Sequence, residues 1–251
     1  MTARPAILVT GGAKRIGRAI ATAFGEAGWH VVIHYGNSRE QAEALAGELP
    51  SAEAVQCDLD DWDAGPALIS ELAQRLVDWR VLINCAGVFS FDSAENLQPS
   101  VFDTAMQVNA GSPARIGQAF LAHARSDHGR RLINVTDQKL LNPNPDFFSY
   151  SMSKYALAGT VPMLSMARHD PRDRVYGLAP GAILASHDQS EAETEISHRM
   201  NLLRRKTTAA DIADAAMFLS GGWLESGQTL FVDSGQHLLS QSRDVLFLAR
   251  Q

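Results

Sequence analysis

The stretch AILVTGGAKRIGRAIATAFGEAG, residues 6–28, joins a short apolar run to a segment of helical period through a glycine turn. The run at 6–10 predicts a strand, and 15–28 predicts a helix. Glycines in such a turn let the backbone approach a ligand, and the N-terminus of the helix offers free N–H groups to a phosphate. The stretch therefore predicts an α/β fold whose first turn binds an anion.

The turn TGGAKRIG, residues 10–17, is not the usual dinucleotide fingerprint G-x-G-x-x-G, because only Gly11, Gly12 and Gly17 are glycine. Glycines are also needed simply to pack a helix closely against a strand. On this stretch alone, both interpretations stay open.

The rest of the chain repeats the alternation of strand and helix. We find no internal repeat, low-complexity tract or linker. Near-continuous apolar strands are typical of parallel sheets buried on both faces. The sequence therefore predicts a single domain over 1–251, with a Rossmann-like, doubly wound parallel sheet and helices on both faces. The other expected strands are 30–35, 52–59, 80–87, 130–137, 174–180 and 228–233, and the other clearest helices are 38–49 and 150–169.

Two long segments, 138–149 and 182–200, are expected to be irregular. Both follow predicted strand ends, where ligands bind in open α/β sheets. We expect them to form the rims of a pocket, with the second acting as a lid. The tail after Gly235 is apolar enough to pack against the domain, but its sequence assigns it no role.

Composition excludes several classes of function. The chain has 251 residues, of which 45% are hydrophobic, and a formal net charge of -6 without any basic block, so nucleic acids and anionic membranes are poor partners. Cys57 and Cys85 are too few for a disulfide framework or a metal cluster, which fits a reducing compartment. No signal peptide and no apolar run of about 20 residues is found, so the cytoplasm is the expected location.

The end of the second expected strand, HYGNSRE at 34–40, bears on the choice of cofactor. An acidic residue at this place usually bonds the ribose 2′-hydroxyl of NAD, and it would repel a 2′-phosphate. Here the first residues after the strand are not acidic, and Lys14 and Arg15 lie in the neighbouring turn. The pattern favours NADPH, although Arg39 could equally be a solvated residue at a helix start. The residues in question are Tyr35, Asn37, Ser38 and Arg39.

The segment YSMSK places Tyr150 and Lys154 four positions apart, on one face of a helix with roughly 5–6 Å between their Cβ atoms. An ammonium beside a phenol stabilises the phenolate, so we expect the pKa of Tyr150 to fall below about 10. Such a tyrosine suits a proton donor near neutral pH. The pair alone is common by chance, and it gains weight from the glycine turn and from NCAG at 84–87.

The ordered set TGGAKRIG, CDL, NCAG, VNAGSP, YSMSK and APGAI resembles the short-chain dehydrogenase/reductase family over about residues 5–235. The resemblance implies that Tyr150 gives the proton, that Lys154 bonds the nicotinamide ribose and that Asn109 holds a water linking Lys154 to solvent. It implies a homotetramer with helices from 98–124 and 150–169 at an interface. It also implies contacts to the cofactor from Gly11, Lys14, Arg15, Ile16, Asp58, Leu59, Asn84, Ala86, Gly87, Pro180, Gly181 and Ile183.

Two departures from the general family pattern narrow the resemblance. Arg15 stands where the second motif glycine is usual, and Asp137 stands where the catalytic serine is usual, thirteen residues before Tyr150. Both departures occur together in the branch of pteridine and dihydromonapterin reductases, which this chain resembles. That resemblance implies that Arg15 reaches the pterin and the phosphates, that Asp137 partners the tyrosine, and that Phe89 covers the pterin ring.

An aspartate at this place has a chemical consequence. A serine hydroxyl donates a hydrogen bond to the oxyanion that develops during carbonyl reduction, whereas an ionised carboxylate cannot donate and would repel it. A ring C=N bond needs a proton on nitrogen instead, which an acid bonded to Tyr150 could pass on. The sequence thus predicts an NADPH-dependent reductase of a dihydropterin, with dihydromonapterin, dihydrobiopterin or dihydrofolate as candidate substrates.

Several alternatives stay open on the sequence. If the alignment slips by one position, Thr136 supplies a hydroxyl and the protein is an ordinary carbonyl or alcohol oxidoreductase. Phe89 could be only a pocket wall, and Arg15 could bind only the phosphates of the cofactor. A protein that senses NADPH without turnover is a third hypothesis, disfavoured because a sensor needs no proton relay. No metal site is predicted.

Overall fold

The computed structural model describes residues 4–183 and 189–250. In this part of the chain, seven strands form one all-parallel sheet in the order β3-β2-β1-β4-β5-β6-β7. The order reverses between β1 and β4, which is where open α/β sheets bind ligands. The strands are β1 (Ala6–Val9), β2 (His30–Tyr35), β3 (Ala52–Gln56), β4 (Trp79–Asn84), β5 (Arg131–Val135), β6 (Arg174–Pro180) and β7 (Thr229–Val232).

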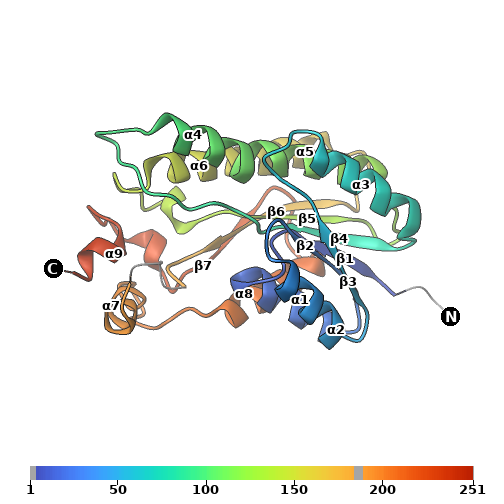
Figure 1. Ribbon diagram of the computed structural model, residues 1–251, viewed down its shortest axis with the longest axis horizontal. Helices are drawn as coiled ribbons and strands as arrows, with labels where there is room; N and C mark the ends of the chain where they lie inside the picture. The colour runs from blue at the N-terminus through green and yellow to red at the C-terminus, as the bar shows by residue number, and fades with distance from the viewer. Residues whose placement is uncertain (1–3, 184–188, 251) are drawn as a thin grey trace.

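Helices cover both faces of this sheet (Figure 1). One layer holds α1 (Arg15–Glu26), α2 (Arg39–Glu48) and α8 (Ala209–Ser220), and the other holds α3 (Ala64–Arg75), α4 (Pro99–Met106), α5 (Ser112–His123) and α6 (Phe148–Ala167). A π-helical turn, Gln107–Gly111, joins α4 to α5. The predicted fold class, a doubly wound parallel sheet, is confirmed.

Two hydrophobic cores follow from the alternation of side chains along each strand. On one face, Ile7 and Val9 of β1 pack with Phe24 of α1. On the other face, Leu8 of β1 packs with Phe120 of α5. Because both faces are covered, every residue of β1 is buried, and its sequence is a continuous apolar run.

Several strands end earlier than the apolar pattern predicts. The expected strand 80–87 ends at Asn84, and the expected strand 130–137 ends at Val135. In both cases the chain leaves the sheet, and the following residues line a cavity at the carboxyl edge. Residues 85–87 and 136–137, which the sequence pattern assigns to strands, therefore belong to the cavity wall.

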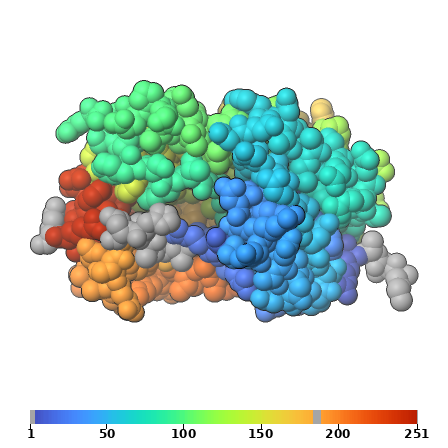
Figure 2. Space-filling view, viewed as in Figure 1, coloured from blue at the N-terminus to red at the C-terminus, as the bar shows by residue number. Residues whose placement is uncertain are grey.

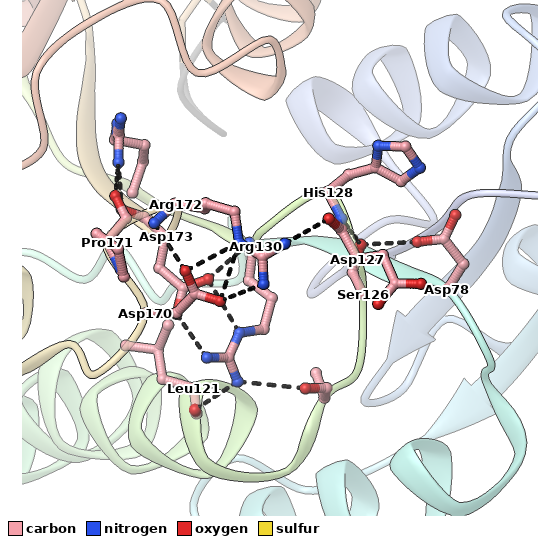
Figure 3. A network of polar contacts seen from close by, with 12 residues as sticks. Asp78, Leu121, Ser126, Asp127, His128, Arg130, Asp170, Pro171, Arg172 and Asp173 are labelled. Atoms are coloured by element: carbon pink, nitrogen blue, oxygen red, sulfur yellow. Dashed lines mark hydrogen bonds and ion pairs between the residues drawn. The ribbon is translucent and has the colours of Figure 1, made fainter.

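A polar network ties the loops together at the amino ends of β5 and β6 (Figure 3). Arg130 pairs with the fully buried side chain of Asp173 at 2.5 Å, and it also donates to the Leu121 carbonyl at the end of α5. Arg172 donates to Asp170 and to the Asp127 carbonyl. Since ligands bind at the opposite edge of such sheets, we assign this network a structural role.

The two segments expected to be irregular differ from each other. In 138–149, a 3₁₀ turn (Gln138–Leu140) leads to α6, and Gln138 and Lys139 line the same cavity as Asp137, as a pocket rim should. In 182–200, the expectation of irregular structure is wrong in part. Ser190 and Glu193 form a capping box that starts α7 (Glu191–Ser197), a local signal that the sequence contains. Residues 184–188 of the expected lid lie outside the described residues.

The tail after Gly235 folds back onto the domain as a 3₁₀ turn (Gln236–Leu238) and the short helix α9 (Val245–Leu248). Figure 2 shows this C-terminal segment, in red, between the green surface over α4 and the orange surface over α7. The tail therefore packs against the domain, as its apolar composition predicts, beside both rims of the cavity.

Candidate active site

A cavity of about 490 Å³ lies at the carboxyl edge of the sheet. Its walls come from the loops after β1, β4, β5 and β6, from α6 and from the C-terminal segment. The topology therefore brings together motifs that are far apart in the sequence. Thirteen of the predicted site residues line this cavity: Gly11, Lys14, Arg15, Ile16, Ala86, Gly87, Phe89, Asp137, Tyr150, Lys154, Pro180, Gly181 and Ile183.

The centre of the cavity is a contact between a phenol and a carboxylate. The Tyr150 hydroxyl donates a hydrogen bond to Asp137 Oδ2 at 2.6 Å. The Lys154 ammonium lies 5.6 Å from the centroid of the Tyr150 ring and donates to the Val135 carbonyl at 2.8 Å. Helix α6 supplies Tyr150 and Lys154 from one face, and the end of β5 supplies Asp137.

The expectation that the lysine lowers the pKa of Tyr150 is wrong for this arrangement. Burial raises the pKa of Tyr150 well above its usual value, and the Asp137 carboxylate raises it further. Burial also raises the pKa of Asp137, which the charge of Lys139 only partly offsets. Burial lowers the pKa of the Lys154 ammonium. Burial and, when it is ionised, the carboxyl group that contacts the phenol oxygen thus outweigh the more distant ammonium.

Thr136, the alternative to Asp137 as the partner of Tyr150, uses its hydroxyl to bond another strand. Its side chain is buried, and its hydroxyl donates to the Leu178 carbonyl at 3.3 Å. The hydroxyl that a shifted alignment would place beside Tyr150 is thus hydrogen-bonded to the neighbouring strand β6. The geometry favours Asp137 as the partner of Tyr150.

Asn109 lies in the π-helical turn between α4 and α5, behind the cavity wall. Its Oδ1 accepts from the Val88 backbone N–H at 2.8 Å, and its Nδ2 donates to the Val88 carbonyl and to Ser153 Oγ, each at 3.0 Å. These contacts fix the loop after β4 against α6. A Cβ at Gly87 would lie 3.1 Å from Asn109 Oδ1 and 3.8 Å from Lys154 Nζ, which explains the glycine of NCAG. The role of Asn109 in holding a water stays a prediction.

The first turn is organised by a residue that sequence reasoning missed. The Gly11 N–H donates to His34 Nδ1 at 3.1 Å, so His34 Nε2 carries the proton and donates to the Cys57 carbonyl at 3.0 Å. Burial lowers the pKa of His34, which keeps the ring neutral. His34 thus joins the turn after β1 to the end of β3. The sequence signal that could have revealed this role is a histidine within a mostly apolar strand.

Arg15 has a left-handed backbone, with φ of 55°. Such a conformation costs little for glycine and more for any residue with a Cβ. The position therefore has a backbone that would suit glycine, while it carries an arginine side chain into the cavity wall. Backbone strain retained beside a cavity is typical of a functional position.

The N-terminus of α1 suits an anion. No side chain caps this helix end, and Lys14, Arg15, Ile16 and Gly17 around it all line the cavity. Backbone N–H groups and the helix dipole favour a phosphate at such a place. Free helix donors, two basic side chains and close backbone approach together fit the pyrophosphate of a dinucleotide.

Other predicted cofactor residues lie outside the cavity wall. The Tyr35 hydroxyl accepts from Arg39 Nε at 3.3 Å, and Arg39 also pairs with Glu43 at 3.2 Å. Asn84 is buried, and its amide donates to Asn134 Oδ1 at 2.9 Å and to the Pro113 carbonyl, so it holds β4 against β5 and α5 instead of facing the cavity. Asn37, Ser38, Asp58 and Leu59 lie at the ends of β2 and β3, also outside the wall.

Phe89 forms an aromatic wall beside Tyr150. Its ring stacks on Phe147, with centroids 4.1 Å apart and an interplanar angle of 21°, and it meets the Tyr150 ring edge-on at 4.7 Å. The side chain is 42% exposed. A flat apolar face thus stands open next to the phenol–carboxylate pair, which suits a planar ring.

Some cavity residues were missed because they come from the tail. Asp244, Val245 and Leu246 line the cavity, and Asp244 pairs with Lys139 at 2.7 Å. Nothing in the local sequence of the tail indicates these contacts. Among the described residues, no group of three or more His, Cys, Asp and Glu side chains is arranged to hold a metal. None of the described helices has the length and apolar character needed to cross a membrane.

The fold and the site can be compared with known proteins. The family model described as enoyl-(acyl carrier protein) reductase matches residues 11–237. Versicolorin reductase stcU of Emericella nidulans is 29% identical over 248 residues, covering 91% of this chain and 94% of that protein. The 3-oxoacyl-(acyl-carrier-protein) reductase FabG of Staphylococcus aureus is 27% identical, covering 92% and 97%.

Solved structures agree with these relatives. FolM alternative dihydrofolate reductase 1 from Brucella canis, complexed with NADP, has a TM-score of 0.88 and 31% identity, covering 97% of this chain and 98% of that one. The angucycline C-6 ketoreductase LanV with bound NADP has a TM-score of 0.82 and 30% identity, covering 94% and 96%. With a family model that matches residues 11–237 and a solved structure that is 31% identical over nearly the whole chain, this chain belongs to the short-chain dehydrogenase/reductase family of oxidoreductases.

Proposed function

We propose that the protein is an NADPH-dependent reductase that converts a dihydropterin to a tetrahydropterin. The observation that carries this proposal is the 2.6 Å hydrogen bond from the Tyr150 hydroxyl to Asp137 Oδ2. It places an acid, and not a hydroxyl donor, next to the tyrosine. The candidate substrates are dihydromonapterin, dihydrobiopterin and dihydrofolate.

The choice of cofactor is supported by the residues around the first turn. Lys14, Arg15 and the N-terminus of α1 would hold the phosphates, and Lys154 would bond the nicotinamide ribose. Pro180, Gly181 and Ile183 form the wall along which the nicotinamide would lie. The similar FolM structures from Brucella canis and Brucella suis are complexes with NADP, which also supports this choice. When bound, NADPH supplies the hydride.

The substrate would lie with one face against Phe89. An aromatic pair of this kind contributes about 0.5–1.5 kcal/mol beyond the burial of surface area. Arg15 lines the same cavity and would reach the substrate as well as the phosphates. The names of the FolM structures, which describe an alternative dihydrofolate reductase, support a pterin-type substrate.

The proton chemistry of the site follows from its electrostatics. Because burial raises the pKa of Asp137, the carboxyl holds a proton more readily than an exposed aspartate. Tyr150 would give its proton to the ring nitrogen and take one from Asp137, so that no phenolate stands beside a carboxylate. The resulting Asp137 carboxylate is stabilised by the Lys139 backbone N–H, 2.9 Å from Oδ1, and by the charge of Lys154.

A second candidate is the reduction of a ketone. Versicolorin reductase, FabG and the LanV ketoreductase are similar reductases with other substrates, and they favour this candidate. In this protein, however, the Thr136 hydroxyl donates to the Leu178 carbonyl and Asp137 faces the tyrosine, so neither of these two positions offers a hydroxyl to an oxyanion beside Tyr150.

The deciding experiment measures NADPH oxidation with dihydromonapterin, dihydrobiopterin, dihydrofolate and several ketones. We expect wild-type enzyme to turn over at least one dihydropterin and to be slow with ketones. Asp137→Ser should lose most dihydropterin turnover and gain ketone reduction. Rapid ketone reduction by wild-type enzyme without pterin turnover, or unchanged pterin turnover by Asp137→Ser, would contradict the proposal.

We also propose that the enzyme is a homotetramer. One face of α6 leaves Met152, Tyr155, Met163 and Met166 exposed, which is unusual for a helix that stays in water. Light scattering of the purified protein should give about four times the mass of the chain.

A further inference from the structure

The C-terminal segment, residues 236–250, is held rigidly where it closes the cavity. Arg243 pairs with the buried carboxylate of Asp146 at 2.8 Å, and the Asp244 backbone N–H donates to the same carboxylate. Asn142 and Gln241 exchange hydrogen bonds at 2.7 Å and 2.9 Å. The segment is thus fastened to the rim 138–149, and its side chains have fixed places in the cavity wall.

One of these side chains forms a buried ion pair with the rim. Lys139 Nζ lies 2.7 Å from Asp244 Oδ2, and the two side chains are only 5% and 13% exposed. Lys139 also donates to Asn144 Oδ1 at 3.0 Å. Charges that are shielded from water act over longer distances than charges on the surface. Both members of this pair can therefore influence their neighbours in the cavity.

One group in the cavity that this ion pair can influence is Asp137. Lys139 follows it by two positions, and its backbone N–H binds Asp137 Oδ1 while the Tyr150 hydroxyl binds Oδ2. The cation of Lys139 favours the ionised form of Asp137, and the anion of Asp244 acts in the opposite sense on this site by disfavouring ionisation of Tyr150. The titratable and charged groups that face Asp137 from the surrounding elements are Lys139, Tyr150, Lys154, Cys85 and Asp244, with Lys14, Arg15 and His198 elsewhere in the cavity wall.

We propose that Lys139 and Asp244 are positioning residues that set the proton affinity of Asp137. The tail carboxylate neutralises the ammonium beside Asp137, so that Asp137 keeps its proton up to a higher pH than it would next to an unpaired lysine. This inference rests on the proposed function, in which Asp137 is the source of the proton. It gives the C-terminal segment a chemical role in addition to closing the cavity.

Two single substitutions should act in opposite directions. Asp244→Asn leaves the Lys139 ammonium uncompensated, which stabilises the Asp137 carboxylate and lowers its pKa. Lys139→Gln removes the cation and leaves the Asp244 carboxylate, which raises the pKa of Asp137, while the backbone N–H at position 139 is retained. We expect the titration midpoint of Asp137 to move by about one pH unit in opposite directions in the two single variants. In the double variant it should lie close to that of the wild type.

The test is a direct titration of Asp137 in the intact, NADP-loaded protein. Carboxyl ¹³C NMR of protein with labelled aspartate follows the ionisation, and the resonance missing from Asp137→Asn assigns it. Opposite displacements in the two single variants support the proposal. Displacements in the same direction, or none, overturn it. If Asp244→Asn fails to fold, Lys139→Gln decides alone: a pKa of Asp137 that is lowered or unchanged overturns the proposal.

Arg243→Gln is the matched control. It breaks another ion pair of the same segment, at a side chain that does not line the cavity. It should lower the melting temperature without displacing the Asp137 titration. An equal displacement in this variant would show that loosening the tail, and not the charge of Asp244, is the cause, and would overturn the proposal. Since NMR needs no turnover, absence of pterin reduction would count against the proposed function only.

Discussion

The Tyr150 hydroxyl, on α6, donates a hydrogen bond to the carboxylate of Asp137, at the end of β5, across 2.6 Å. Both groups are partly buried, and burial raises the pKa of each. Two hydrogen-bonded acids in such a place titrate as a coupled pair, in which neither is easily ionised while the other is charged. This pair distinguishes the site from one in which a hydroxyl stabilises an oxyanion.

In the proposed mechanism Tyr150 is the last proton donor before the substrate, and Tyr150→Phe removes this donor. We expect kcat to fall by about 10²–10⁴-fold, since general acid catalysis contributes on this scale. Binding of NADPH should persist, because Lys154 and the first turn are unchanged. Steady-state kinetics and fluorescence titration of NADPH measure the two quantities. A rate close to that of wild type would exclude Tyr150 as the donor.

Asp137→Asn should make the protein more stable at neutral pH. Because the folded state raises the pKa of Asp137, burying its ionised form costs free energy once the pH rises through that pKa. At low pH the residue is protonated in both states and no such cost remains. The difference in urea midpoint between variant and wild type should therefore shrink as the pH falls. A difference that grows towards low pH would mean that the folded state lowers this pKa.

Arg15→Gly should make the protein more stable but weaken the binding of its ligands. The left-handed backbone at Arg15 costs an L-residue about 1 kcal/mol more than glycine, so the free energy of unfolding should rise by about that amount. At the same time, loss of the side chain should raise KM for the pterin or for NADPH. Urea denaturation and steady-state kinetics give the two values.

Arg204→Gly is the control for that experiment. Arg204 is exposed, has a φ of 49° and does not line the cavity. It should give a similar gain in stability with unchanged kinetics. If Arg15→Gly changed no kinetic constant either, Arg15 would contact neither ligand.

Phe89→Ala should weaken binding of a planar substrate. Loss of the stacking surface should raise KM for a dihydropterin about threefold to tenfold, with a smaller effect on NADPH. Phe91→Ala is the matched control, because Phe91 belongs to the same aromatic cluster but does not line the cavity. Equal effects of the two substitutions would make Phe89 a packing residue only.

Much of the fold can be predicted from short stretches of the sequence. The strand at 30–35 is found with the predicted bounds, and the glycine turn and the pair Tyr150–Lys154 lie where their spacing predicts. Periodicity, turn glycines and helix spacing each depend on a few neighbouring residues, so one sequence suffices to find them. The exchange of serine for Asp137 was visible in the same way.

The sequence by itself thus determined the parallel sheet, the edge at which the cavity lies and most of the side chains at the centre of the candidate site. Only the tertiary structure decided the electrostatics of the site. The ion pairs of Lys139 with Asp244 and of Asp146 with Arg243 join residues about a hundred positions apart, and His34 binds Gly11 from another strand. Burial and such distant contacts set the direction of each pKa shift. The pKa of Tyr150, expected to fall beside its lysine, is instead raised by burial and by Asp137.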